Sequence, residues 1–127
     1  MQTQNIVVSF VAAEAITEFA LVSIDTNGKI VITDAGTDKA CVGVAQRACA
    51  SGEVTDVLVH GVTRVISAGA LTFATTPILA ATTDGKVEAV ASSDYAVARV
   101  LPNINQTSSA AGEQINVFFF GPVELKA

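Results

Sequence analysis

The segment SGEVTDVLVHG, residues 51–61, has a close counterpart in AGEQINVFFFG, residues 111–121. Both contain a Gly-Glu step, both carry Val four residues after the glutamate, and both end in Gly. Val57 and Val59 share one face of an extended chain, because side chains alternate across a strand. The repetition therefore predicts two equivalent strands in two related parts of the sequence.

The same order of features recurs on the N-terminal side of each segment. The matched pairs lie 56 to 60 residues apart and are Gly28 and Gly85, Ala40 and Ala96, Val44 and Val100, Gly52 and Gly112, and Gly61 and Gly121. A hairpin turn, a strand and a Gly-Glu strand thus appear over 19–61 and again over 78–121. Neither part alone has enough strands to bury its apolar face. We therefore expect an all-β fold, a small β-barrel or sandwich built from an internally duplicated β unit about a pseudo-twofold axis.

Length and composition agree with one β domain over residues 1–127. Half of the residues are hydrophobic and 15% are charged. The apolar residues are mostly Val, Ala and Ile, which favours strands. So few charges on a small body leave much neutral surface, which suggests that a partner covers part of it.

Turn signals and one ambiguous segment refine this picture. The Asn-Gly pair in DTNGK (25–29) and the Asp-Gly pair in TTDGK (82–86) predict two-residue hairpins. A calcium loop at 25–28 is a poor alternative, because the later acidic ligands are missing. The segment TDKACVGVAQRACA (37–50) has the alanine content of a helix, but Gly43 and the clustered valines favour a strand.

The charge distribution argues against nucleic acid and membrane partners. The net charge is −5 and the seven Lys and Arg are scattered, whereas a nucleic-acid groove or an anionic membrane requires a basic cluster. The first ten residues, MQTQNIVVSF, have no positive region before their apolar run, so no secretory signal is expected. We expect a protein made and kept in the cytoplasm, or assembled there into something larger.

Groups capable of chemistry are few. His60 is alone, Cys41 and Cys49 with one histidine are too few for a zinc site, and no phosphate-binding loop or G-x-S-x-G element occurs. Glu53 and Glu113 are matched by the duplication, which favours a structural role at the start of a strand. We therefore predict no catalytic residue, no metal site and no cofactor.

Three segments remain as candidates for contact with a partner. Residues 1–10 are expected to form an extended N-terminal arm, either a disordered tail or a strand added to a partner. The polar stretch 102–112 is expected to be an exposed loop. In VFFFG (117–121), Phe118 and Phe120 face one way and Phe119 the other, which fits a buried central strand or a strand with one face against a neighbouring subunit.

The residues also carry a resemblance. The pattern ITEFALVSID (16–25), the segment from GKIVITDAG to VISAGAL (28–71) and TDGKVEAV (83–90) resemble the decoration, or cement, proteins of tailed-bacteriophage capsids. The similarity covers roughly residues 6–121. It implies a non-enzymatic β-rich protein that binds the outside of an icosahedral head and clamps neighbouring major capsid proteins, commonly as a homotrimer. It places the protein on the capsid exterior of a virion.

Expected exposure alone suggests which residues contact the shell, and the alternation in VFFFG adds one residue for another subunit. The predicted contact residues are Gln2, Thr3, Gln4, Asn5, Ile6, Asn103, Asn105, Gln106 and Phe119. Two other classes stay open. One is another virion part, such as a head-fibre base or a tail protein, and the other is a small-ligand-binding β-barrel with a pocket around His60.

Overall fold

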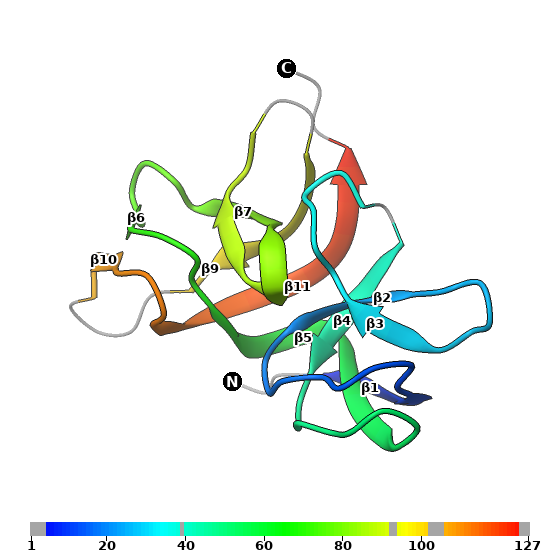
Figure 1. The fold of residues 1–127 in the computed structure, drawn as a ribbon. Coiled ribbons are helices and arrows are strands. Elements are labelled where there is room, and N and C mark those ends of the chain that lie inside the picture. Colours follow the sequence, from blue (N-terminus) through cyan, green and yellow to red (C-terminus); the bar gives the residue numbers. More distant parts are fainter. Residues whose placement is uncertain (1–4, 39, 92–93, 102–105, 125–127) are drawn as a thin grey trace.

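The computed structural model describes residues 5–38, 40–91, 94–101 and 106–124, and the chain is nearly all-β, as expected. In the described part, no helix has the length and apolarity needed to span a membrane. Figure 1 shows the strands. They are β1 (Ile6–Val11), β2 (Leu21–Ile24), β3 (Ile30–Ile32), β4 (Cys41–Ala45), β5 (Val54–Ile66), β6 (Leu71–Thr72), β7 (Ile78–Ala81), β8 (Val87–Ala89), β9 (Tyr95–Val100), β10 (Ser108–Ser109) and β11 (Gln114–Glu124), with a single 3-10 turn η1 (Thr83–Gly85).

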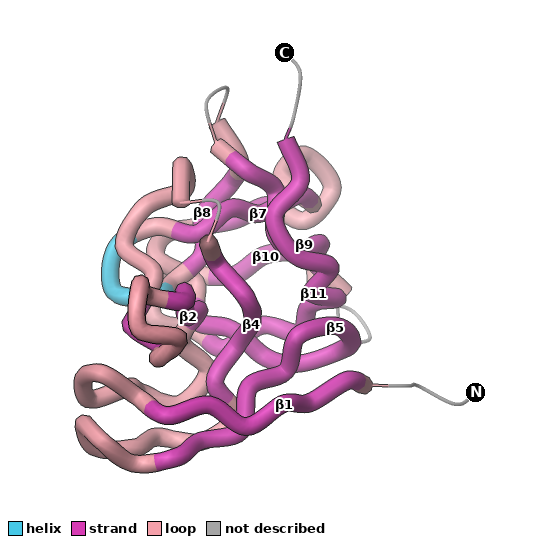
Figure 2. The backbone as a smooth tube through the Cα atoms, turned by 90° about the vertical axis from the view of Figure 1, so that its right-hand side faces the viewer, coloured by secondary structure: helices cyan, strands magenta, loops and turns pink. Residues whose placement is uncertain are grey.

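The main sheet is a curled half-barrel in which equivalent strands lie at equal distances from the centre of the sheet. The order is β3-β2-β4-β5-β11-β9-β7-β8, with β1 paired to β5 off this path. Each strand before the centre has a counterpart after it: β3 matches β8, β2 matches β7, β4 matches β9, and β5 matches β11. This is the arrangement that two copies of one β unit produce when they pack about a pseudo-twofold axis. Figure 2 shows the two long strands β5 and β11 side by side on one side of the molecule.

The strand β5 belongs to both copies of the unit. Its first part, Val54–His60, pairs antiparallel with β1. Its second part, Gly61–Ile66, pairs antiparallel with β11. Gly61 lies inside this one continuous strand and has a positive φ of 134°.

The structural equivalence extends beyond the sequence repeats 19–61 and 78–121. β1 pairs with the last strand of the first copy, which is the first part of β5. In the same way, Gly61–Ile66 pairs with β11, the last strand of the second copy. The residues that follow agree, since Ala12 forms a parallel bridge with Ile30 and Ser67 forms one with Val87. Residues 6–10 of the predicted N-terminal arm thus form most of β1 and pair with the chain's own sheet; residues 1–4 lie outside the described part.

The two hairpins differ in their turns. At the second, Asp84 and Gly85 have φ of 60° and 71°, as a type I′ turn requires, inside a loop closed by a hydrogen bond from the Thr82 N–H to the Lys86 carbonyl. At the first, only Gly28 has positive φ, and the loop is closed by the equivalent hydrogen bond from the Asp25 N–H to the Lys29 carbonyl. The predicted two-residue connection is therefore a three-residue loop in both hairpins; at the first, the Asp25 carboxylate also accepts the N–H groups of Asn27 and Lys29.

The core lies in the concave side of the sheet and has two parts. The larger one combines strands of both copies and includes Leu21, Leu58, Leu79 and Phe119. The smaller one lies under the first copy and is lined by Ala12, Ile16, Val22, Ile30, Ala45 and Val57. These are short or β-branched side chains for the most part, so the sheet must curl tightly to bring them into contact.

The matched turn glycines provide a stability prediction. A Cβ at Gly28 meets nothing within 4 Å, whereas a Cβ at Gly85 lies 2.9 Å from the Ala20 Cβ and 3.0 Å from the Leu21 backbone. Gly28→Ala should cost about 1 kcal/mol of unfolding free energy from positive φ alone. Gly85→Ala should cost at least about twice as much, because the neighbours must also move.

Urea denaturation of the two variants measures this difference. Gly69→Ala is the control, since a Cβ at Gly69 has open space and the backbone there has no positive φ. It should change the unfolding free energy by less than about 0.5 kcal/mol. Equal costs for Gly28→Ala and Gly85→Ala would contradict the packing of the second turn against Leu21.

Candidate interaction surfaces

The carboxylates at the turns hold the backbone. The Glu53 side chain accepts the Ala50 N–H at 2.7 Å, and the Glu113 side chain accepts the Ala110 N–H at 3.0 Å. These two equivalent contacts confirm the structural role predicted from the duplication. Asp34 likewise accepts the N–H of Asp84, which ties the two copies together. Such carboxylates are occupied by caps rather than poised for acid–base chemistry.

The remaining reactive groups do not converge. His60 packs edge-on against Phe118, with ring centroids 5.1 Å apart and an interplanar angle of 86°. Across the described residues, no group of three or more His, Cys, Asp or Glu side chains is placed to hold a metal ion. His60 does not line the two hollows found on the described surface.

One buried polar cluster lies beneath the first copy. The Ser23 hydroxyl lies 2.6 Å from the Thr33 hydroxyl and donates to the Asp38 carboxylate at 2.7 Å. Cys41 lies beside this cluster as a buried free thiol, and Cys49 is also free but partly exposed. Burial raises the pKa of Cys41 to about 11, against a smaller lowering by its hydrogen bonds with Thr33 and Gly43. A thiol held in its neutral form is a poor nucleophile.

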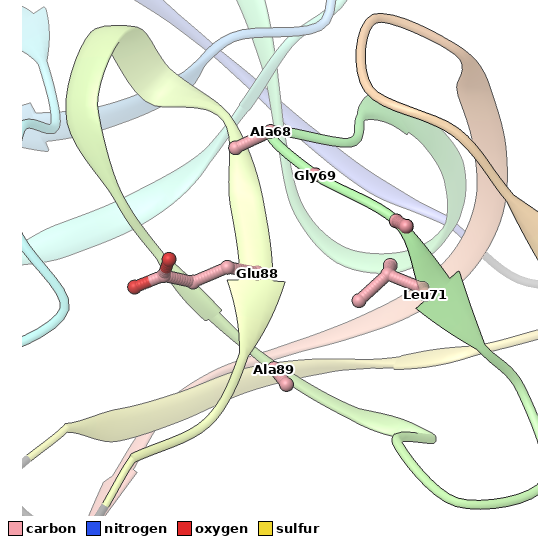
Figure 3. A pocket seen from close by; sticks show the side chains of 6 residues that line it. Ala68, Gly69, Leu71, Glu88 and Ala89 are labelled. Carbon is pink, nitrogen blue, oxygen red and sulfur yellow. The ribbon is translucent and has the colours of Figure 1, made fainter.

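The largest described hollow is small and has little chemistry. It is about 280 Å³ and is lined by Ala68, Gly69, Ala70, Leu71, Glu88 and Ala89. Figure 3 shows the Glu88 carboxylate turned away from the Gly69–Leu71 segment. A single exposed carboxylate without a paired acid, base or nucleophile does not form a catalytic site.

The predicted contact residues fall in different environments. Gln2, Thr3, Gln4, Asn103 and Asn105 lie outside the described residues. Asn5 caps the backbone edge of β5 at Val62. Its side-chain amide accepts a hydrogen bond from the Val62 N–H at 3.0 Å and donates one to the Val62 carbonyl at 3.2 Å. Ile6 is 54% exposed on β1. Gln106 is half-buried, and its side chain donates to the Ser108 carbonyl at 3.4 Å.

Phe119 requires a correction. Its side chain is fully buried in the core, so it offers no surface to another subunit. The aromatic residues on the outer face of β11 are its neighbours Phe118 and Phe120, which are half-buried. The alternation of VFFFG was read correctly, but the sequence did not show which of its two faces points into the half-barrel.

Around Phe118 the outer face of the sheet is basic and aromatic. Phe118 pairs across the sheet with Val62 of β5 on one side and with Arg99 of β9 on the other. Two residues earlier on β11, Asn116 pairs with Arg64 of β5. Arg64 and Arg99 are exposed. The ion pair found among the described residues uses the third arginine instead, with Arg47 3.5 Å from Asp56.

This basic-aromatic face, defined by Arg64, Arg99, Phe118 and His60, was missed by sequence reasoning. The arginines are 35 positions apart in the chain, and only the strand register brings them to opposite sides of one phenylalanine. Arginine and aromatic side chains are enriched in protein interfaces, where charged partners complement the guanidinium groups. The face therefore fits an acidic protein surface.

A second surface is apolar and lies on β1. Four of the five large hydrophobic side chains that are exposed in the described part belong to this strand, and the fifth, Val54, is the cross-strand neighbour of Val11. We call this group the β1 edge patch; its members are Ile6, Val7, Val8, Val11 and Val54. Isolated exposed apolar residues are common, but their concentration on one strand indicates an interaction site.

Comparisons with known proteins identify the fold. No protein-family model matches the chain, and no curated protein matches it. Among solved structures, the N base of the head fiber protein gp8.5 of bacteriophage phi29 is similar, with a TM-score of 0.67. The correspondence covers 96% of this chain and 100% of that chain at 13% sequence identity. The two chains thus share their whole fold.

The buried thiol gives a pH prediction. The ordinary pKa of a cysteine is 9.0 here and that of Cys41 in the folded chain is about 11, so the folded state keeps a proton that the unfolded state loses. The stability that the neutral Cys41 thiol contributes is complete below about pH 9. As the pH rises to about 11 this stability is lost, and the unfolding free energy falls by up to about 1.4 kcal/mol per pH unit.

Urea denaturation between neutral and alkaline pH, for the wild type and Cys41→Ala, isolates this contribution. The difference in unfolding free energy between the two proteins should be constant below pH 9 and should shrink above it. Cys49→Ala is the control and should run parallel to the wild type. A difference that stays constant through pH 11 would show that Cys41 is not shielded from water.

Proposed function

We propose that this chain is a structural protein of a phage virion, built like the base of a head fibre and attached to the outer surface of the head. The observation that carries the proposal is the correspondence with the phi29 head-fibre base over 96% of this chain and 100% of that chain.

Two further observations support a structural role. The resemblance of residues 6–121 to capsid decoration proteins points to the same place, the outside of a phage head, from sequence features alone. The Glu53 and Glu113 carboxylates cap turns, and the buried Cys41 thiol is held neutral. The chemistry that the chain offers is surface complementarity rather than catalysis.

A cement protein is the second candidate, favoured by the decoration-protein resemblance. Both roles require binding to the major capsid protein on the head exterior. They differ in the consequence of binding, since a cement protein strengthens the shell and a fibre base holds a further structure away from it. The trimeric state that the resemblance implies, and contacts through the residues of the arm and the 103–106 loop, belong to this second candidate.

The first test is binding to heads that lack this protein. Purified protein mixed with such heads, from the phage that encodes it, should co-sediment and saturate at a fixed ratio to the major capsid protein, because the shell repeats the same site by symmetry.

Heat-induced rupture of DNA-filled heads then separates the two roles. A raised rupture temperature supports cement, and an unchanged one supports a fibre base. Absence of co-sedimentation would overturn both.

The basic-aromatic face supplies matched variants for this assay. If it meets an acidic patch of the shell, the double variant Arg64→Gln/Arg99→Gln should raise the dissociation constant by about tenfold and weaken its dependence on salt. Arg64→Gln and Arg99→Gln are also tested singly against Arg47→Gln, which removes the same single charge from a residue that is already paired with Asp56, so binding of Arg47→Gln should match the wild type. Equal losses in all three single variants would mean that only net charge matters.

A further inference from the structure

The β1 edge patch lies along an open strand edge. β1 pairs with β5 on one side, and no other backbone partner of Ile6–Val11 occurs in the described part of the chain. Its sequence, IVVSFV, contains no charge and no proline. Natural sheets protect such edges with charges, prolines, short strands or covering segments, since an open edge recruits another strand. In Figure 2, β1 lies toward the lower margin of the molecule.

The other edges of the sheet are protected. The outermost strands β3 and β8 have three residues each, and each is met by a parallel bridge, from Ala12 to Ile30 and from Ser67 to Val87. The edge of β5 that is equivalent to the outer edge of β1 is capped by the Asn5 side chain at Val62. Of two edges related by the internal duplication, one is therefore capped and the other is open.

We propose that β1 pairs antiparallel with β1 of a second copy of this chain, across a two-fold axis near the middle of the strand. The chain carries a net charge of −5, so two copies repel over most of their surface. The side chains of the β1 edge patch are uncharged, so two copies can approach there without bringing like charges together. The basic-aromatic face is unsuitable for such a contact, because a two-fold axis there would bring arginines against arginines.

A two-fold pairing also limits the number of copies and covers the exposed side chains of the patch. Antiparallel pairing of a strand with itself consumes both open edges and leaves none, so association stops at two copies. Ile6 then lies opposite Val11 of the second copy, Val7 opposite Phe10 and Val8 opposite Ser9, so the exposed apolar side chains of one copy are covered by the strand of the other. The ladder has six residues, far fewer than the about 20–30 residues a side of a standard interface, so the contact should be weak in solution.

Sedimentation equilibrium of the purified protein tests this inference without reference to the virion. Protein up to about 1 mM should show a reversible monomer–dimer equilibrium with a dissociation constant in the micromolar to millimolar range. Val8→Lys should weaken dimerisation at least about tenfold, because it places two like charges beside the axis. Val54→Lys adds the same charge to a more exposed residue on β5, one strand away from the open edge, and should have a smaller effect.

A charge-swap mixture makes the test independent of folding. Val8→Lys and Val8→Glu should each be monomeric alone and should form a heterodimer when mixed, which shows that both variants are folded. Hydrogen exchange of the wild type adds a second measurement, since amides of Val7–Val11 should become more protected as concentration rises. A wild type that stays monomeric at about 1 mM, a trimer unaffected by Val8→Lys, or a mixture that does not associate would overturn the inference.

Discussion

The antiparallel pairing of β5 with β11 is the constraint on which the rest of the structure depends. It joins the two copies of the β unit through Gly61–Ile66 and Gln114–Phe119, and the sheet order is symmetric about it. The buried side chains of these strands, among them Val65, Ile115, Val117 and Phe119, form the centre of the larger core cluster. Without this pairing each copy would be an open sheet with one apolar face in water, which is marginal at best.

The duplication could be read from the sequence because it rests on backbone requirements. The pairs Gly52 with Gly112 and Gly28 with Gly85 have positive φ in both copies, a conformation that other residues adopt with strain. Such requirements persist in a sequence even when side chains diverge. They predicted the all-β fold and the equivalence of the two Gly-Glu strands, but both hairpin loops are one residue longer than predicted, because the closing hydrogen bonds join Asp25 to Lys29 and Thr82 to Lys86.

The surfaces could not be read in the same way, because they depend on register and on the direction in which the sheet curls. Phe118 and Phe119 are neighbours in the sequence, and only the curl of the half-barrel decides that Phe119 is buried. Arg64 and Arg99 become neighbours of one phenylalanine through two independent strand registers. A one-residue slip in either register would move an arginine to the other face of the sheet.

The tandem arrangement itself creates the asymmetry between the two copies. In each copy the first strand lies on the last strand, but the first strand of the second copy is the continuation of β5 and is held at both ends by the chain. For the first strand of the first copy, β1, the described residues provide no backbone partner on its outer edge. A duplication that closes the core thus leaves one surface that differs from its counterpart, and it is there that the exposed apolar side chains are concentrated.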